Sequence, residues 1–238
     1  MQVEDSSGVE PLAAQWRQIG RSFEGRAMLA ATLGAGSKRL YLIGGVHGDE
    51  LPGLEALPQL RDLLRQAGNR GDFTIRILQD SNPDGTHSRT RGNARGVDLN
   101  RNFPAKSFRA TRAHGATAAS EVETRFLLED LRAFEPDVVV TFHAARQGPF
   151  VNYDGPGLEL AERFVRGARS EDARWTVEAQ IGYETPGSLG ALLGDDEGLP
   201  VLTIEFPRAA SASEVWPALS AGMLALLESE PSASTSLR

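Results

Sequence analysis

Cysteine is absent from the 238 residues of this chain. A chain without cysteine has no disulfide framework, no thiol nucleophile and no cysteine-ligated metal, so a tightly held transition metal would need His, Asp or Glu ligands. Histidine is also scarce, because the chain contains only four. A metal site in this protein is therefore expected to combine a few histidines with carboxylates.

An excess of basic residues and long apolar runs are also missing. The formal net charge is −7 and the pI is about 5.2, which argues against nucleic acid or an anionic membrane surface as the main partner. No apolar run approaches the length that crosses a bilayer. The first residues, MQVEDSSGVEPLAAQW, lack the basic region and apolar core of a secretory signal. We expect a cytoplasmic enzyme, and the sequence leaves its oligomeric state open.

Hydrophobic residues, by contrast, make up 40% of the chain, which is enough for a large buried core. Apolar runs alternate with amphipathic stretches, the pattern of a domain rich in βα units. We therefore predict a single α/β domain over residues 1–238, with a mixed, mostly parallel sheet flanked by helices. Its core is expected at about 20–228, before a flexible tail at 229–238.

The element boundaries follow from the same patterns. The predicted strands cover Leu40–Val46, Phe73–Gln79, Asp137–Phe142, Trp175–Ala179 and Val201–Phe206. The predicted helices cover Leu51–Ala67, Glu121–Phe134, Gly157–Ser170 and Ala212–Glu228. Residues 81–117 are rich in Gly, Asn, Arg and Pro, so we expect a long irregular loop that is too polar to form core and is either functional or disordered. His87 and His114 lie in this polar sequence and are expected to face solvent.

Two histidines follow strongly apolar runs. His47, with Glu50 three positions later, comes after LYLIGG, and His143 comes after DVVVTF. Open α/β sheets bind ligands at the carboxyl ends of their strands. Two histidines and one carboxylate leave an open position on a catalytic zinc. The alternative is that His47 and Glu50 are solvated loop groups and that His143 bonds to the backbone at a strand end.

A carboxylate also interrupts the apolar segment VLTIEFP at Glu205. Burying it is costly unless it has a task or a partner. Facing a zinc-bound water, such a glutamate can accept a proton and later pass it to a leaving amine. The alternative is an edge-strand glutamate that faces water.

Arginine is concentrated in one segment of this acidic protein, RTRGNARGVDLNRNFP at 89–104. The planar fork of arginine suits carboxylates and oxyanions. A solvated basic loop is the alternative, but Gly92, Gly96 and the sequence VDLN indicate a loop of defined shape. The arginines are Arg89, Arg91, Arg95 and Arg101.

Several motifs occur in a fixed order: IGRSFEGRAM at 19–28, HGDE at 47–50, NPDG at 82–85 and, after an arginine, GVDLNRNF at 96–103. In this order the sequence resembles the zinc carboxypeptidase family, from about residue 20 to about residue 207. The ordered set is far more specific than any one motif. The resemblance implies one zinc per chain, held by His47, Glu50 and His143. It also implies that Glu205 is the general acid/base and that Arg91 polarises the scissile carbonyl.

The resemblance further implies roles around the substrate. Asn100 and Arg101 would hold a terminal carboxylate, and Asp98 would orient His47 through a hydrogen bond. Tyr183 matches the substrate-contacting tyrosine of the family. Its alternative is an interfacial tyrosine with a hydrated hydroxyl.

Within the family, VNYDGPG (151–157) and GYETPGSLG (182–190) resemble the murein peptide amidases, although HAARQGPF (143–150) departs from their pattern. The implied reaction is hydrolysis of the γ-D-glutamyl–meso-diaminopimelate bond of a murein tripeptide. Asp154 is the candidate for the distal ammonium of diaminopimelate, and Arg146 for its distal carboxylate. A turn-forming aspartate and a solvated arginine are the alternatives.

Three other functions stay open. Amidohydrolases such as succinylglutamate desuccinylase and aspartoacylase share HGDE and DLNRNF with this chain, but not NPDG or GYETPGS. An ordinary metallocarboxypeptidase would act on protein C-termini. A catalytically dead binding module is the third alternative, disfavoured by the intact ligand set and Glu205.

Overall fold

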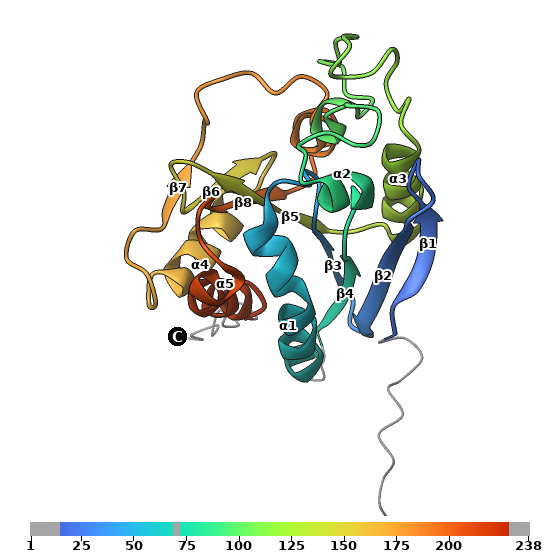
Figure 1. The fold of residues 1–238 in the computed structure, drawn as a ribbon. Helices are drawn as coiled ribbons and strands as arrows, with labels where there is room; N and C mark the ends of the chain where they lie inside the picture. The colour runs from blue at the N-terminus through green and yellow to red at the C-terminus, as the bar shows by residue number, and fades with distance from the viewer. Residues whose placement is uncertain (1–14, 69–71, 229–238) are drawn as a thin grey trace, which may run out of the picture.

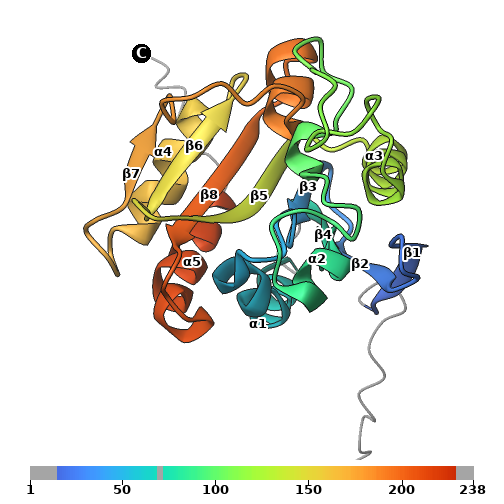
Figure 2. The same ribbon diagram turned by 45° about the horizontal axis from the view of Figure 1, so that its top comes forward.

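The computed structural model describes residues 15–68 and 72–228, and an eight-stranded mixed sheet runs through its centre. The strand order is β1-β2-β4-β3-β5-β8-β6-β7, which Figure 2 shows from edge to edge. Four of the neighbouring pairs are parallel and three are antiparallel. The predicted α/β class with a mixed, mostly parallel sheet is confirmed. The strands are β1 Arg17–Arg21, β2 Ala27–Gly34, β3 Lys38–Ile43, β4 Phe73–Leu78, β5 Val138–Ala145, β6 Phe150–Asp154, β7 Thr176–Glu178 and β8 Val201–Pro207.

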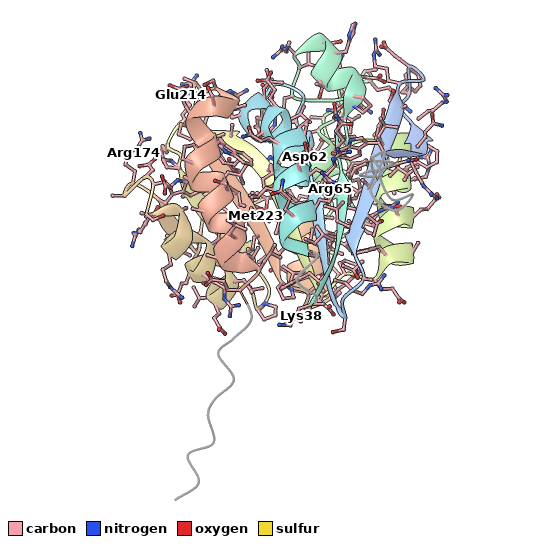
Figure 3. The ribbon with its side chains drawn as sticks, turned by 90° about the horizontal axis from the view of Figure 1, so that it is seen from below. Lys38, Asp62, Arg65, Arg174, Glu214 and Met223 are labelled. Carbon is pink, nitrogen blue, oxygen red and sulfur yellow. The ribbon has the colours of Figure 1, made fainter. Side chains whose placement is uncertain are left out.

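Helices cover both faces of the sheet (Figure 1). On one face lie α1 (Leu51–Gly68), α4 (Leu158–Ala168) and α5 (Ala212–Leu226), which pack on one core cluster. Figure 3 shows this face from below, with α5, which carries Met223, beside α1. On the other face lie α3 (Val122–Phe134) and a π-helical segment, Ala191–Asp196. Two shorter elements, α2 (Pro83–Ser88) and a 3-10 turn (Leu99–Arg101), lie in the loops.

The alternation of side chains explains why the central strands are apolar along their whole length. On β3, Leu40 and Leu42 point into the core under α1, α4 and α5, whereas Tyr41 and Ile43 point into the core under α3. A strand buried on both faces reads as a continuous apolar run.

The same alternation places polar side chains of β5 and β8 on the side of the sheet that faces away from α1, α4 and α5. On β8, Leu202, Ile204 and Phe206 point into the core under α1, α4 and α5. Thr203 and Glu205 therefore point to the opposite face. On β5, Phe142 and Ala144 point into the same core. Thr141 and His143 therefore point to the opposite face, beside their register partners Thr203 and Glu205. The sequence of each strand thus places its polar residues on one side of the sheet.

Two strand ends differ from the sequence predictions. Strand β5 was expected to end at Phe142 but continues to Ala145, because β8 offers pairing partners as far as Pro207. His143 therefore lies inside the strand instead of after it. Strand β3 ends at Ile43 instead of Val46, because the chain turns at Gly45, whose φ of +66° suits glycine.

Strands β1, β2 and β6 were not predicted from the sequence. The prediction that residues 81–117 are too polar to form core was wrong. Val97, Leu99 and Phe103 are buried beneath α3 and the π-helical segment. The predicted tail at 229–238 lies outside the described residues. Within 15–68 and 72–228, no helix is long and apolar enough to cross a membrane, and the cytoplasmic location stays a prediction.

Candidate active site

Three side chains from distant parts of the chain converge on one point. The Nδ1 atoms of His47 and His143 lie 3.0 Å apart, and Oε2 of Glu50 lies 3.0 Å from the first and 2.9 Å from the second. The exposed fractions of the three residues are 3%, 3% and 5%. Two imidazole nitrogens and a carboxylate oxygen this close can all bind one small cation. The geometry brings together the predicted ligand set.

The hydrogen bonding of His47 leaves the correct nitrogen free for a metal. Its Nε2 lies 3.0 Å from Oδ1 of Asp98. Because a carboxylate only accepts, Nε2 carries the proton and Nδ1 presents its lone pair to the centre. Although burial opposes the charged form, the carboxylates of Asp98 and Glu50 raise the pKa of His47. This is the carboxylate–histidine support that metal-ligating histidines normally have, so the residues present fit a zinc ion.

The turn that carries His47 and Glu50 is fixed by close backbone packing. Helix α1 begins at Leu51, directly after Glu50, and the N–H of Ala144 donates to Oε2 of Glu50 over 3.1 Å. A Cβ atom at Gly48 would lie 1.9 Å from the carbonyl carbon of Gly85. The HGDE turn therefore packs directly against the backbone of the NPDG segment, so the two motifs support each other in this structure.

Arg91 lies beside the metal ligands. Its Nε donates to Oδ2 of Asp98 over 2.9 Å, and its Nη1 donates to Oε1 of Glu50 over 3.1 Å. Burial would raise the pKa of Asp98, but the hydrogen bond from His47 and the charge of Arg91 hold that pKa well below its usual range. Asp98 thus orients a metal ligand and an arginine at the same time.

Glu205 lies directly across from His143 on the neighbouring parallel strand. Among the described residues, none forms a hydrogen bond or ion pair with its carboxylate. Burial raises the pKa of Glu205, the charge of His143 opposes this, and the charge of Glu50 adds to it. A carboxylate with a raised pKa next to a metal centre is suited to exchanging protons near neutral pH.

A cavity of about 1130 Å³ opens over this centre. Its floor is the open face of β5, β8 and β6, and the segment between β7 and the π-helical turn, which arches over the sheet in Figure 1, forms one wall. The cavity contains every predicted substrate-contacting residue: Asn100, Arg101, Tyr183, Asp154 and Arg146.

Asn100 and Arg101 meet the wall formed by residues 187–190. Oδ1 of Asn100 accepts a hydrogen bond from the N–H of Leu189 over 3.0 Å, and a Cβ atom at Gly187 would lie 2.5 Å from the carbonyl oxygen of Arg101. Burial lowers the pKa of Arg101, although Asp98 opposes this. Tyr183 lies on the same wall and is 65% exposed.

Asp154 lies at the far end of this wall. A Cβ atom at Gly190 would lie 2.1 Å from its Oδ2. Burial raises the pKa of Asp154 to about 6, and the charge of Asp195 adds to the shift. No cation of the described chain lies within ion-pair distance of Asp154. Its carboxylate is therefore available to a cationic ligand.

The structure does not bring Arg146 close to Asp154. Strand β8 pairs with Asp154 at Val201 and with Ala145, the neighbour of Arg146, at Pro207. Six residues of extended strand separate these positions by roughly 20 Å. The two residues lie at opposite ends of the cavity, with Glu205 between them.

The other two histidines are not part of the site. His87 is exposed, as predicted, whereas His114 is half-buried and its Nδ1 lies 3.0 Å from the carbonyl oxygen of Arg109. Sequence reasoning missed Asp49 and Arg208, which form an ion pair beside Glu50. Their positions offered a signal, since Asp49 separates two metal ligands and Arg208 follows the strand that carries Glu205.

The site combines three buried metal ligands, an unpaired carboxylate across from one of them and an arginine beside them. With the mixed α/β sheet, this arrangement defines a metallohydrolase with one metal ion. Comparison with known proteins refines that class.

Residues 7–187 match the zinc carboxypeptidase family, and the chain belongs to that family. It is 30% identical to murein peptide amidase A of Escherichia coli strain K12 over 216 residues, which covers 81% of each chain. The crystal structure of murein-tripeptide amidase from Escherichia coli O157 superposes with a TM-score of 0.69 at 28% identity, covering 92% of this chain and 94% of the other. Thrombin-activatable fibrinolysis inhibitor reaches a TM-score of 0.75 at 16% identity, with coverage of 89% and 68%, and shows the shared fold.

Together the family and these relatives make the protein a metallopeptidase, with zinc as the metal of its family. His47, Glu50 and His143 are the group that could hold one metal ion. Glu205 lies beyond the matched residues 7–187, so its role rests on its position across from His143.

Proposed function

We propose that this metallopeptidase hydrolyses the amide bond between γ-D-glutamate and meso-diaminopimelate in murein peptides. The observation that carries the proposal is the unpaired carboxylate of Asp154, in the same cavity as the metal ligands. Diaminopimelate carries an ammonium group at the distal end of its side chain, which Asp154 can bind. The similarity to proteins named murein peptide amidase supports the same substrate.

The proposed mechanism assigns a task to each residue of the centre. Zinc, when bound by the three ligands, supplies a Lewis acid that polarises a carbonyl and acidifies water. Glu205 accepts a proton from the attacking water and returns it to the leaving amine. Arg91, oriented by Asp98, donates to the oxygen that becomes negative in the transition state. Losing one such donor often costs roughly 3–4 kcal/mol.

The diaminopimelate half lies along the wall at residues 187–190. Asn100 and Arg101 hold the carboxylate beside the cleaved amide, and Tyr183 contacts the bound peptide from the overlying segment. Asp154 binds the distal ammonium. No arginine is assigned to the distal carboxylate. Arg146 is too far from Asp154 for both residues to bind the distal end of the same diaminopimelate.

A second candidate is a metallocarboxypeptidase that removes C-terminal lysine or arginine from ordinary peptides. Asp154 would also suit those cationic side chains. Part of the chain is similar to the catalytic chain of rat carboxypeptidase N, at 33% identity over 114 residues, which cover 36% of this chain and 25% of that one.

Mass-spectrometric rate measurements on two peptides distinguish the candidates. One is L-Ala-γ-D-Glu-meso-diaminopimelate, and the other is an α-linked peptide that ends in L-lysine. We expect kcat/KM to be at least tenfold higher for the murein tripeptide. Asp154→Asn should lower it by roughly 10- to 100-fold, because a charged hydrogen bond is lost. Faster hydrolysis of the α-linked peptide would instead support the carboxypeptidase.

A further inference from the structure

Two arginines that the proposed mechanism does not use, Arg146 and Arg208, lie at one end of the cavity. Arg146 directly follows strand β5, and Arg208 directly follows strand β8. The N–H of Arg208 donates to the carbonyl oxygen of Ala145 over 3.0 Å, so the two strands end side by side. This end of the cavity therefore has two guanidinium groups in its lining.

The guanidinium of Arg208 is fixed beside the metal ligands. It forms an ion pair with Asp49, and its Nη1 lies 3.8 Å from Oε1 of Glu50. The side chain is nevertheless 40% exposed. Because a guanidinium has five N–H donors, the pair with Asp49 orients Arg208 and leaves donors for a ligand in the cavity.

The opposite end of the cavity is occupied by the residues proposed to bind the leaving amine. Asp154 pairs with Val201, at the start of β8, whereas Arg208 follows the end of that strand. Glu205, which acts on the scissile bond, lies between them. A substrate whose amine half points toward Asp154 must extend its acyl half toward Arg208.

The acyl half of a γ-glutamyl amide has a feature that an α-linked peptide lacks. Its α-carboxylate is free and lies roughly 5 Å from the scissile carbonyl carbon, at the end of a short alkyl chain. An α-linked residue has no free α-carboxylate, and it presents an uncharged group in that region unless its own side chain is acidic. A cation on the acyl side of the metal therefore distinguishes a γ-glutamyl residue from α-linked residues without an acidic side chain.

We propose that Arg208 binds the free α-carboxylate of the γ-glutamyl residue and thereby selects γ-glutamyl substrates over α-linked substrates that have no acidic side chain at this position. This role rests on the proposed function, because it presumes a γ-D-glutamyl amide as substrate. Arginine is suited to it, since its planar fork can hold a carboxylate through two hydrogen bonds. Asp49 is the positioning residue that holds the fork toward the cavity.

The test changes the charge on each side of the contact. The substrates are L-Ala-γ-D-Glu-meso-diaminopimelate and the same tripeptide with the glutamyl α-carboxylate converted to a carboxamide. The wild-type enzyme should prefer the carboxylate by about 10- to 100-fold in kcat/KM. Arg208→Gln should lower kcat/KM for the carboxylate by that factor and leave the carboxamide nearly unchanged. Arg174→Gln, at an exposed arginine away from the cavity, is the matched control and should keep the preference.

Each other outcome decides against the role of Arg208. An equal loss on both substrates would assign it to catalysis or folding, and unchanged values would show that it does not contact the carboxylate. A larger loss of preference in Arg146→Gln would move the contact to that residue. Equal wild-type rates on both tripeptides would overturn the role of Arg208 while the proposed function stands. Hydrolysis of neither would overturn both.

Discussion

His143 and Glu205 are register partners on two adjacent parallel strands, and both point to the open face of the sheet. Neighbouring strands lie about 4.8 Å apart, so this register fixes the carboxylate next to the metal centre without a hydrogen bond between the two side chains. The ladder runs from the pair Val139 and Val201 to the pair Ala145 and Pro207. The backbone therefore positions the proposed base relative to a ligand.

Glu205→Gln should keep the fold and the metal but lose most activity. The amide is nearly isosteric with the carboxylate and, since Glu205 is not one of the three ligands, metal binding does not need its charge. General acid/base groups typically contribute 10²- to 10⁴-fold, so kcat should fall by about that range. Steady-state kinetics with zinc analysis check this, and Glu159→Gln, at an exposed carboxylate on α4, is the control. Activity within a few-fold of wild type would mean that another base acts.

His143→Ala should abolish stoichiometric zinc in the purified protein. The variant leaves only His47 and Glu50 of the convergent set, and two ligands hold zinc much less tightly than three. Plasma mass spectrometry of the metal content measures the effect. His87→Ala, at an exposed histidine, should retain one zinc per chain. A His143→Ala protein that still carries a full equivalent would contradict the ligand assignment.

The metal centre was predictable because its ligands follow apolar runs that are visible in the sequence. The run DVVVTF reports burial on both faces of β5, and HGDE follows the buried strand β3. The strand ends were less predictable. Pairing with β8 extends β5 through His143 to Ala145. Because β8 is distant in sequence, the segment HAAR itself contains no feature that predicts this extension.

Elements with few buried residues were missed for a related reason. Strand β6 spans FVNYD and fully buries only Val151, so it lacks a clear alternating pattern. The separation of Arg146 from Asp154 depends on the antiparallel register between β6 and β8. No local sequence feature encodes that register. The sequence alone therefore gives no distance between Arg146 and Asp154, which were predicted to bind the same end of diaminopimelate.

Gly48→Ala should disrupt the metal centre although it changes no ligand. The new Cβ atom would lie 1.9 Å from the carbonyl carbon of Gly85 and 2.2 Å from the nitrogen of Thr86. Both are backbone atoms, so the HGDE turn would have to move, and His47 and Glu50 would move with it. We expect substoichiometric zinc and a lower midpoint in thermal unfolding.

Gly25→Ala separates this collision from ordinary glycine replacement. Gly25 has a φ of +85°, and a Cβ atom added there would meet no other atom within 4 Å. Alanine there should cost about 1–2 kcal/mol of backbone strain and leave zinc binding unchanged. Equal zinc content in the Gly48→Ala and Gly25→Ala proteins would show that the turn accommodates the added methyl group.

Asp80 should make the protein less stable as the pH rises above about 4. Burial raises the pKa of Asp80 to about 6, against an ordinary value of 3.8. The folded state therefore binds the proton more tightly than the unfolded state, so this contribution to stability is complete below pH 3.8 and is lost as pH rises to 6. At pH 7.5 the ionised carboxylate costs about 2–3 kcal/mol.

Asp80→Asn tests this cost. The variant keeps an oxygen acceptor for the N–H of Asn82, which donates to Oδ1 over 2.9 Å. It should raise the free energy of unfolding by about 1–3 kcal/mol at pH 7.5 but not at pH 3.5. Urea denaturation of the metal-free proteins at both pH values measures the difference, with Asp62→Asn on the exposed face of α1 as the control. A gain of the same size at both pH values would show that the substitution acts through packing instead of charge.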